Sequence, residues 1–399
     1  MPSEAMWVRE MKAFTVIAAS FFRYFIIVST FLVFAAALSR SFEHAPFIGV
    51  AKQGVLILFS LTAVICAGHL AGASLAIFGY FIFLFFGAFF TLPSDFNLTT
   101  LFNIFGYILL FLLYCAFGAR NSRRFFEEIV NVLVWISPIF LLINGISMGD
   151  SDAYTYGKHQ FQGVFYNPNP FSAFCSVLLI ACVWRGFVAP GRRLERLLCL
   201  VSVLGLVVML LMSFSRAAIL ATSIGLFLMP FSTRLKVAVG VVFSFVAVSY
   251  FLVGVGPDDI VVQRDVMEES GRVQILENYI AKLNEYYWVF GTGFSLDGDR
   301  IKSELSYFDV WLSTGVGFLG FGVFWLVAIV ASFRVRKVGY GGLASTLLFF
   351  VLTLSLFEGY LANVSSIITV LAYVVAGVVT RLGREVESKR LLSSESSLA

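Results

Sequence analysis

Runs of about twenty apolar residues follow one another along almost the whole chain, and this feature most limits what it can fold into. Crossing the hydrocarbon layer as a helix takes roughly 20 apolar residues. Only helices or closed barrels satisfy every backbone polar group in lipid. The runs are continuous rather than alternating, so they predict helices. Composition agrees, because only 13% of the 399 residues are charged, about half the usual share in a soluble domain.

The chain is therefore predicted to be an all-α polytopic membrane protein of about 12 transmembrane helices, forming a single transmembrane domain over residues 1–399. The expected spans lie near residues 17–38, 49–68, 71–92, 100–118, 127–147, 169–186, 196–213, 215–231, 236–255, 307–332, 342–358 and 360–380. Only Glu358-Gly359-Tyr360 separate the last two spans, which predicts a tight turn. The first apolar stretch lacks a small-residue cleavage site, so it is predicted to be a retained helix.

Basic residues predict the orientation of these helices. The fourth, sixth, eighth, tenth and twelfth predicted helices are each followed by basic residues, among them Arg120, Arg192, Arg234, Arg336 and Arg384. By the positive-inside rule, these loops and both termini are predicted to face the cytoplasm, as expected of an inner-membrane protein. The opposite side carries a large acidic loop over 256–306, with an amphipathic helix at 271–290, and a smaller loop over 148–168. Residues 385–399 are expected to form a disordered cytoplasmic tail.

The cysteines and histidines do not indicate a metal centre. All five cysteines lie in or beside apolar runs without a CxxC pair, and the three histidines are scattered. Buried thiols that act as small hydrophobic side chains are the expected state, rather than a disulfide framework or a zinc site. The sequence predicts no metal and no cofactor.

Two short polar segments interrupt the apolar pattern at the predicted outer side. Asn167 and Asn169 precede the sixth helix, where asparagine is a preferred N-cap. These side chains would equally suit hydrogen bonding to a sugar or phosphate at that helix start. Ser215 and Arg216 lie in the link between the seventh and eighth helices. A guanidinium there can snorkel to the interface, or it can bind a diphosphate in a bidentate way.

The large outer loop carries two further polar segments. Arg272 opens the predicted amphipathic helix, which ends at Gly291-Thr292-Gly293. Arg272 is either a solvated surface residue or a second anion-binding group. The loop closes with a polar segment that contains Glu304, Ser306, Tyr307 and, one helical turn further on, Asp309. A carboxylate at a helix start fits ordinary capping, and it also fits a general base beside a lipid-exposed cavity.

Taken together, the four segments resemble the bacterial O-antigen ligase and O-antigen polymerase superfamily. The elements that carry the resemblance are Asn167-Pro168-Asn169, Ser215-Arg216-Ala217-Ala218, Arg272, Gly291-Thr292-Gly293, and Glu304-Leu305-Ser306-Tyr307 with Gly315. They cover roughly residues 160–330. Their order and common sidedness carry the match, rather than any single motif.

The resemblance implies a glycosyltransferase of the GT-C type that uses an undecaprenyl-diphosphate-linked oligosaccharide without a nucleotide sugar or divalent metal. Arg216 and Arg272 would hold the leaving diphosphate, because paired cations stabilise the charge that develops as the C–O bond breaks. Glu304 would deprotonate the acceptor hydroxyl. The implied substrate-binding residues are Asn167, Asn169, Ser215, Gly293, Ser306, Tyr307 and Asp309. Membrane lipid and a polysaccharide chain-length regulator are the other implied partners, and nucleic acid is not one.

One departure from the pattern bears on the reaction. Ligases that resemble this pattern carry a histidine where this chain has Glu304, counted back from Gly315. The carboxylate favours a Wzy-type polymerase, which joins one lipid-linked glycan to another at the periplasmic face. The alternative is an O-antigen ligase that transfers glycan to lipid A–core. The same departure leaves two roles open for Glu304, that of the base and that of a sugar-binding residue.

A flippase or secondary transporter belongs to a different class of function. Transporters usually place ionisable residues near the middle of the membrane. The central spans here are nearly uncharged, with Arg23 and Lys52 as partial exceptions. A purely structural membrane scaffold is the remaining alternative.

Overall fold

The computed structural model describes residues 4–42, 45–89, 98–155, 160–189, 193–230, 289–291, 293, 305–361, 363–364 and 366–396. The helices are α1 (Glu4–Ala37), α2 (Pro46–Ala67), α3 (Ser74–Phe89), α4 (Leu98–Phe117), α5 (Arg123–Ser147), α6 (Pro168–Val183), α7 (Arg193–Met212), α8 (Arg216–Leu228), α12 (Ser306–Thr314), α13 (Gly317–Val335), α14 (Tyr340–Leu354) and α15 (Ile367–Ser396). A π-helical turn, Trp184–Val188, extends α6. The strands β1 (Tyr154–Thr155) and β2 (Gln160–Phe161) form a short antiparallel hairpin.

The described helices confirm a polytopic membrane protein. Seven of them (α1, α2, α5, α6, α7, α13 and α15) contain stretches long and apolar enough to cross a membrane, and the shorter α3, α4, α8 and α14 are also apolar. Through α8, the helices match the predicted spans to within a few residues at most boundaries, although α1 begins well before its expected span. The ninth predicted span, 236–255, and nearly all of the amphipathic helix at 271–290 lie outside the described residues.

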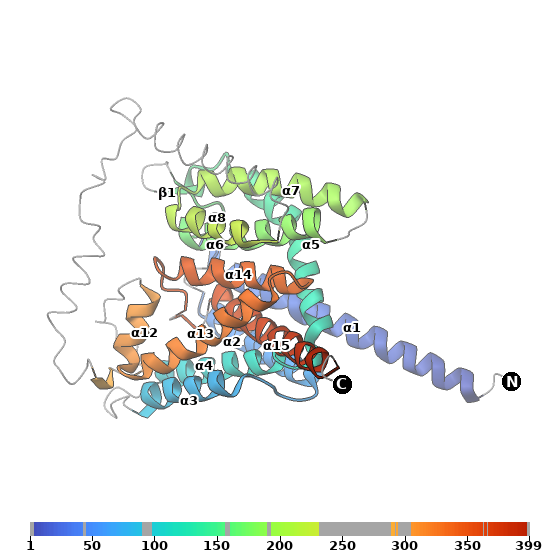
Figure 1. The fold of residues 1–399 in the computed structure, drawn as a ribbon. Helices are drawn as coiled ribbons and strands as arrows, with labels where there is room; N and C mark the ends of the chain where they lie inside the picture. Colours follow the sequence, from blue (N-terminus) through green and yellow to red (C-terminus); the bar gives the residue numbers. More distant parts are fainter. Residues whose placement is uncertain are drawn as a thin grey trace.

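The helices pack in layers (Figure 1). In this view α6, α7 and α8 form the upper layer, α3 and α4 lie at the bottom, and α13, α14 and α15 lie between them. The contacts agree, since α14 packs on α8 and α15, while α13 packs on α3. Both chain ends lie toward the right, and the β1–β2 hairpin and α12 lie toward the left. The two ends of the bundle are therefore formed by different segments of the chain.

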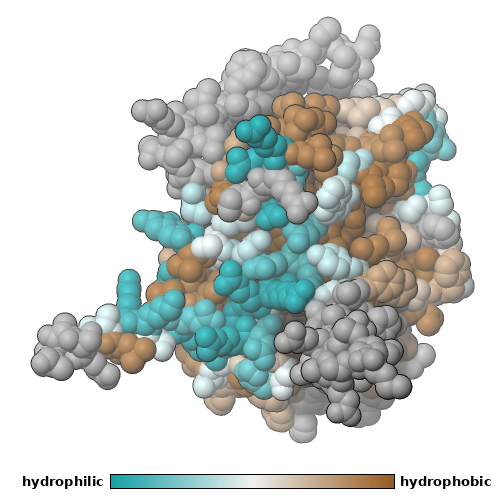
Figure 2. Space-filling model, turned by 90° about the vertical axis from the view of Figure 1, so that its right-hand side faces the viewer, coloured by the Kyte–Doolittle hydropathy of each residue, from teal (hydrophilic) through white to brown (hydrophobic). Residues whose placement is uncertain are grey.

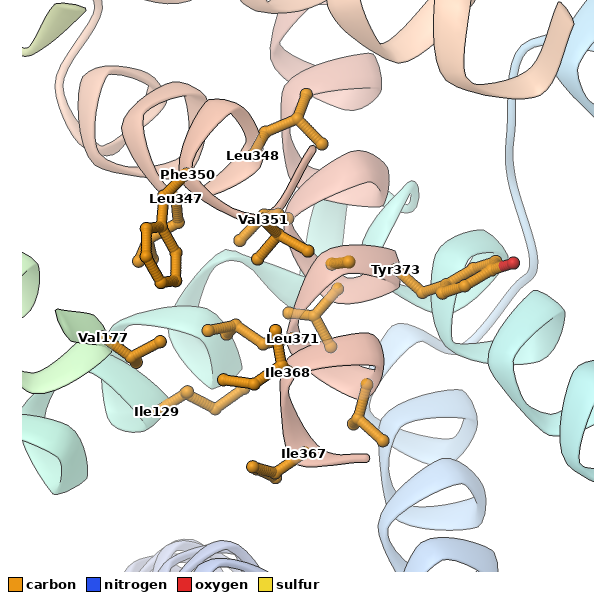
Figure 3. Packing of buried hydrophobic residues seen from close by; sticks show 14 of the residues in the cluster. Ile129, Val177, Leu347, Leu348, Phe350, Val351, Ile367, Ile368, Leu371 and Tyr373 are labelled. Atoms are coloured by element: carbon orange, nitrogen blue, oxygen red, sulfur yellow. The ribbon is translucent and has the colours of Figure 1, made fainter. Parts of the chain in front are cut away.

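The core of the bundle is built around α15 and α6. Within their most apolar windows, 94% of the residues of α15 and 78% of those of α6 are buried, against 28% for α1 and α7. Apolar side chains from α5, α6, α14 and α15 meet in one cluster (Figure 3), which includes Ile129, Val177, Leu347, Val351 and Leu371. The helices α1 and α7 are therefore peripheral, and most of their residues are not buried in the bundle.

Two glycines allow α3 and α13 to cross at close distance. A Cβ atom added at Gly320 would lie 2.3 Å from the carbonyl oxygen of Gly79, and one added at Gly79 would lie 2.6 Å from the carbonyl oxygen of Gly320. Small residues at helix crossings let the backbones approach, and this approach favours association in lipid. Aromatic side chains pack around the crossing, with the rings of Phe83 and Phe321 at 5.1 Å.

Two predictions for the C-terminal third are corrected. The expected tenth helix, 307–332, is split into α12 and α13 at Gly315, which has a φ of 53°. The tight turn predicted at Glu358-Gly359-Tyr360 is instead part of a longer connection, because α14 ends at Leu354 and α15 begins at Ile367. We call residues 355–366 the outer link. Apolar residues such as Leu356 and Leu361 made this connection look like helix in the sequence.

The predicted disordered tail over 385–399 is also corrected, because α15 remains helical to Ser396. Glutamate, lysine, arginine and leucine, which all favour helices, make up seven of the twelve residues from Glu385 to Ser396. Extending a helix that has already formed costs far less than starting one. The Nη1 atom of Arg334 lies 3.1 Å from Oε2 of Glu387, so an ion pair fastens the extension to α13.

Arg23, one of the two charged residues noted within the predicted spans, forms an ion pair. The Arg23 guanidinium in α1 donates to both carboxylate oxygens of Glu128 in α5, at 2.8 and 3.0 Å. The exposed fraction of the side chain is 16% for Arg23 and 5% for Glu128. Charges inside a membrane protein are commonly paired in this way. The pair joins two helices near the end of the bundle that holds the termini, rather than lining a central pathway.

Figure 2 looks onto that end of the bundle, where hydrophilic side chains gather across the middle and apolar side chains surround them. Basic side chains at this end include Arg123 and Arg124 at the start of α5 and Arg334 at the end of α13. By the positive-inside rule this end is expected to face the cytoplasm. The opposite end, where the hairpin and α12 lie, is called the outer end below.

Candidate functional site

The segment before α6 is held in place by a folded loop. Asn144, which is buried in α5, accepts a hydrogen bond from the backbone N–H of Val164 at 3.1 Å through its side-chain oxygen. Gly163 has a φ of 57°, and a Cβ atom there would overlap the Asn144 side chain. The backbone of Tyr166 bonds to the carbonyl of Leu38 at the end of α1. The predicted loop over 148–168 therefore packs onto the bundle and fixes where α6 starts.

Asn167 is the N-cap of α6. Its side-chain oxygen accepts from the backbone N–H of Asn169 at 2.8 Å, and Pro168 occupies the first helical position. This is the capping arrangement that the sequence suggested as one alternative. The Asn167 oxygen is therefore engaged in holding the helix start, and substrate binding by this residue stays a prediction.

The start of α8 lies against the start of α6. The Ser215 hydroxyl, 7% exposed, donates to Oδ1 of Asn169 at 3.4 Å. Phe214 turns the chain sharply between α7 and α8 with a φ of 51°, a conformation uncommon for a residue with a Cβ atom. Arg216 follows as the first residue of α8, and it is exposed. The structure thus brings three predicted site residues together, with a guanidinium beside them.

The start of α12 is bound to the outer link. The Ser306 hydroxyl donates to the carbonyl oxygen of Glu358 at 2.6 Å and accepts from the N–H of Leu361 at 2.9 Å. The Tyr307 hydroxyl donates to the carbonyl oxygen of Leu352 at 3.0 Å. A Cβ atom added at Gly359 would lie 3.8 Å from Oδ2 of Asp309. Ser306 and Tyr307 therefore have structural hydrogen bonds, and Asp309 lies beside the outer link.

The outer link also approaches the segment before α6. Burial, the Glu358 carboxylate and the Tyr166 phenol together raise the pKa of Tyr360 well above its usual value. Tyr360 therefore stays protonated at neutral pH and can donate a hydrogen bond but cannot serve as a base. Tyr166 and Glu358 therefore lie within electrostatic range of Tyr360. The residues before α6 and those after α14 lie at the same end of the bundle.

The packing of α8 on α14 shows where Arg216 lies along the length of the bundle. A Cβ atom added at Gly225 would lie 3.3 Å from the Cβ atom of Phe350, and one added at Gly342 would lie 2.7 Å from the ring of Pro230. The two helices are therefore antiparallel. Helices rise 1.5 Å per residue, and Arg216 lies nine residues before Gly225, whereas α14 ends four residues after Phe350. Arg216 therefore lies at the end of the bundle where α14 ends and the outer link begins.

We refer to residues 166–169, 215–216, 306–309 and 358–361 together as the outer rim. It combines one guanidinium with two carboxylates and several amide, hydroxyl and phenol groups. Sequence reasoning missed Glu358 and Tyr360, which it assigned to a turn. A lone carboxylate between two apolar runs on the outer side was the signal that could have identified Glu358.

Gly293 lies away from the outer rim. Its N–H donates to the carbonyl oxygen of Ser313, near the opposite end of α12 from Ser306. A Cβ atom at Gly291 would lie 2.5 Å from the same carbonyl oxygen, and one at Gly315 would lie 2.1 Å from the carbonyl oxygen of Val289. The glycines thus let two backbones touch where α12 turns into α13, which is a structural role.

Two of the three predicted catalytic residues, Arg272 and Glu304, lie outside the described residues. Among the residues that the structure does describe, no three histidine, cysteine, aspartate or glutamate side chains gather as a metal-binding group. All five cysteines are unpaired, four of them are buried and Cys66 is partly buried.

A change at Ser306 tests whether the outer link depends on α12. We expect Ser306→Ala to lower the free energy of unfolding by about 1–3 kcal/mol, because a buried carbonyl and N–H both lose their partner. Thermal unfolding of the purified protein in detergent measures this. The matched control is Ser313→Ala, since the Ser313 hydroxyl bonds only to the preceding turn of its own helix. Equal unfolding midpoints for the two variants would contradict the assignment.

The fold and the outer rim together define a membrane-embedded helical protein with a mixed-charge polar site at one end of its bundle. No protein-family model matches the chain. No curated protein matches it significantly either.

Proposed function

We propose that the protein is a polysaccharide polymerase of the O-antigen ligase and polymerase superfamily, with a GT-C-like fold. It would act at the periplasmic face of the bacterial inner membrane, with both termini in the cytoplasm. One observation carries the proposal: polar segments far apart in sequence pair at the outer end of the bundle, Asn169 with Ser215 and Ser306 with Glu358, and Arg216 begins α8 beside the first pair. An arginine suits a diphosphate, and a carboxylate suits the removal of a proton from a sugar hydroxyl.

In the proposed reaction, an acceptor hydroxyl of one lipid-linked glycan attacks the anomeric carbon of another. The new glycosidic C–O bond forms as the bond between that carbon and the diphosphate oxygen breaks. The hydroxyl proton passes to a carboxylate, and the electron pair leaves with the diphosphate. Arg216, with Arg272 by resemblance, would stabilise the negative charge on the leaving group. This chemistry requires no metal.

Three carboxylates compete for the role of base. The resemblance assigns it to Glu304. The geometry favours Glu358, since it is partly buried and its backbone carbonyl accepts a hydrogen bond from Ser306 at the start of α12. Asp309 lies beside the same link. We assign the proton transfer to Glu358 and a sugar-binding role to Asp309, because a hydrogen bond from another helix fixes the backbone of Glu358.

The test of this function uses purified protein in lipid nanodiscs with an undecaprenyl-diphosphate-linked repeat unit as both donor and acceptor. A ladder of lengthened lipid-linked glycans on a gel supports the polymerase. Transfer only to added lipid A–core, with no ladder, would show that the protein is a ligase rather than a polymerase. Absence of any glycan transfer, with both substrates present and the protein folded, would remove the proposal.

The same assay tests the base. We expect Glu358→Gln to lower the elongation rate by about 100-fold or more, as is typical when a general base is removed. The amide keeps the size and hydrogen-bonding capacity of the side chain but cannot take up the proton. Elongation rates at saturating donor measure the effect. Glu387→Gln is the control, because its carboxylate lies at the other end of the bundle. An elongation rate in Glu358→Gln equal to that of the wild-type protein would show that Glu358 is not the general base, and would leave Glu304 and Asp309 as the candidates.

A further inference from the structure

Two arginines share one hydroxyl between α1 and α5, at the end of the bundle that holds the termini. Nη2 of Arg23 donates to Oγ of Ser20 at 3.1 Å, and Nη2 of Arg124 donates to the same oxygen at 3.4 Å. A hydroxyl oxygen has two lone pairs and one proton. Because guanidinium groups occupy both lone pairs, the Ser20 proton is left to donate, and among the described residues it has no acceptor.

The charges around this hydroxyl do not balance. Glu128 lies between the same two arginines, since it accepts both hydrogen bonds from Arg23 and its Oε1 lies 3.5 Å from Nε of Arg124. Two guanidinium groups and one carboxylate leave a net charge of +1. Arg123 adds nothing to this charge, because it is paired with Glu127 at 3.0 Å. The cluster therefore attracts one further negative group.

The start of α5 favours an anion at the same place. Arg123 and Arg124 are the first two residues of the helix, and its first turn contains no acidic residue. A helix N-terminus is partially positive, so it stabilises anions and opposes cations. The arginines also precede their glutamates by four residues, which is the less favourable order for such pairs in a helix. These two arginines therefore do little for the helix itself, and a bound anion would compensate both charges.

The surroundings of Ser20 indicate that the anion belongs to a lipid. Phe21, Phe22 and Phe25 follow it in α1, and their side chains are 73%, 52% and 58% exposed. Figure 1 shows α1 passing α5, on which it packs, and continuing out of the bundle at this end. Aromatic rings beside a polar group are typical of the membrane interface. A free phosphate ion would leave these rings uncovered, whereas the chains of a phospholipid would cover them.

We propose that Ser20, Arg23 and Arg124 bind the phosphate of an anionic phospholipid, such as phosphatidylglycerol, between α1 and α5. The phosphate oxygens accept from the Ser20 hydroxyl and from the Arg124 guanidinium, whose side chain is 65% exposed. Arg23 stays bound to Glu128 and contributes its charge from within the bundle. Phosphatidylethanolamine fits less well, because its ammonium group is repelled by the net positive charge. This site is separate from the outer rim and does not depend on the proposed function.

The chain offers a matched set of variants. Arg124→Ala removes the exposed guanidinium and leaves the hydrogen bonds between Arg23 and Glu128 in place. Ser20→Ala removes the shared hydroxyl from the peripheral helix α1. Arg123→Ala is the control, because Arg123 is the neighbouring residue, is 72% exposed and is paired with a glutamate four residues on, but its printed partner is Glu127 and not Ser20.

The experiment titrates detergent-purified protein with phosphatidylglycerol or phosphatidylethanolamine and follows binding by native mass spectrometry. We expect the wild-type protein to bind phosphatidylglycerol more tightly. Arg124→Ala should weaken this binding about fivefold, which corresponds to about 1 kcal/mol for one basic group that meets an anionic lipid. Ser20→Ala should weaken it in the same direction, and Arg123→Ala should leave it unchanged. Inorganic phosphate, added as a competitor, should not displace the lipid.

Four results would overturn the site. One is equal affinity of the wild-type protein for the two lipids, and another is unchanged phosphatidylglycerol binding in both Arg124→Ala and Ser20→Ala. An equal loss in Arg123→Ala would show a general attraction of basic residues for anionic lipid rather than a defined site. Displacement of the lipid by inorganic phosphate would make a free anion the ligand. Unfolding temperatures show whether each variant is folded, and if Arg124→Ala is not, Ser20→Ala decides.

Discussion

Arg216→Ala is expected to abolish long-chain glycan, with a loss of elongation rate of about 100-fold or more, the range seen when one group that stabilises charge in the transition state is removed. Arg216 is the first residue of α8 and lies at the end of the bundle where the outer link begins. It would neutralise the diphosphate as it leaves, and no neutral side chain can replace that charge. The elongation ladder in nanodiscs measures the effect, and the chain length of cell-surface polysaccharide measures it in cells.

The controls for this variant separate charge from folding. Arg216→Lys keeps the charge but loses bidentate geometry, so we expect intermediate activity. Arg196→Ala removes an exposed arginine from the other end of α7 and should leave elongation unchanged. Because Arg216 is exposed, the alanine variant should unfold at the same temperature as the wild-type protein. A normal ladder in Arg216→Ala would end the proposed mechanism.

Gly320→Ala is expected to have the largest effect on stability of the changes considered. The added Cβ atom would lie 2.3 Å from the carbonyl oxygen of Gly79, so α3 and α13 must separate. Overpacking a tight contact typically costs up to about 3 kcal/mol, and backbone atoms at a helix crossing cannot move aside as a side chain can. Thermal unfolding of the detergent-purified protein, followed by size-exclusion chromatography, measures the loss.

The control for Gly320 lies two residues further along the same helix. Gly322→Ala adds the same methyl group where nothing lies within 4 Å. It should unfold at nearly the wild-type temperature. If both alanine variants unfolded together, the close crossing of α3 and α13 would be contradicted.

The helices were largely predictable from the sequence because the bilayer imposes a minimum length on every apolar run. Their ends were predictable only where a local signal exists, as at Asn167 and Pro168, which start α6 as expected. The break at Gly315 was not predicted, because it depends on backbone contact with Gly291 and Val289 from a distant part of the chain. No local pattern encodes such a contact.

The candidate site was predicted only in part for the same reason. Sequence reasoning placed Asn169, Ser215 and Arg216 on one side of the membrane, and the structure puts them in one place. It read Glu358 as part of a turn, since Leu356 and Leu361 continue the apolar pattern on either side. The partner that reveals the role of this segment is Ser306, which is more than fifty residues away.

The position of α15 has a consequence for how the chain matures. Among the seven described helices long and apolar enough to cross a membrane, α15 has the most buried apolar stretch and comes last in the sequence. Chains emerge from the ribosome with their N-terminal segments first. Ile129, Val177 and Leu347 therefore enter the membrane before the α15 side chains that cover them in the folded protein. Until α15 has been translated, the apolar faces of the helices that pack against it remain uncovered. A chain released before α15 is made would keep these faces exposed, and we expect it to be degraded.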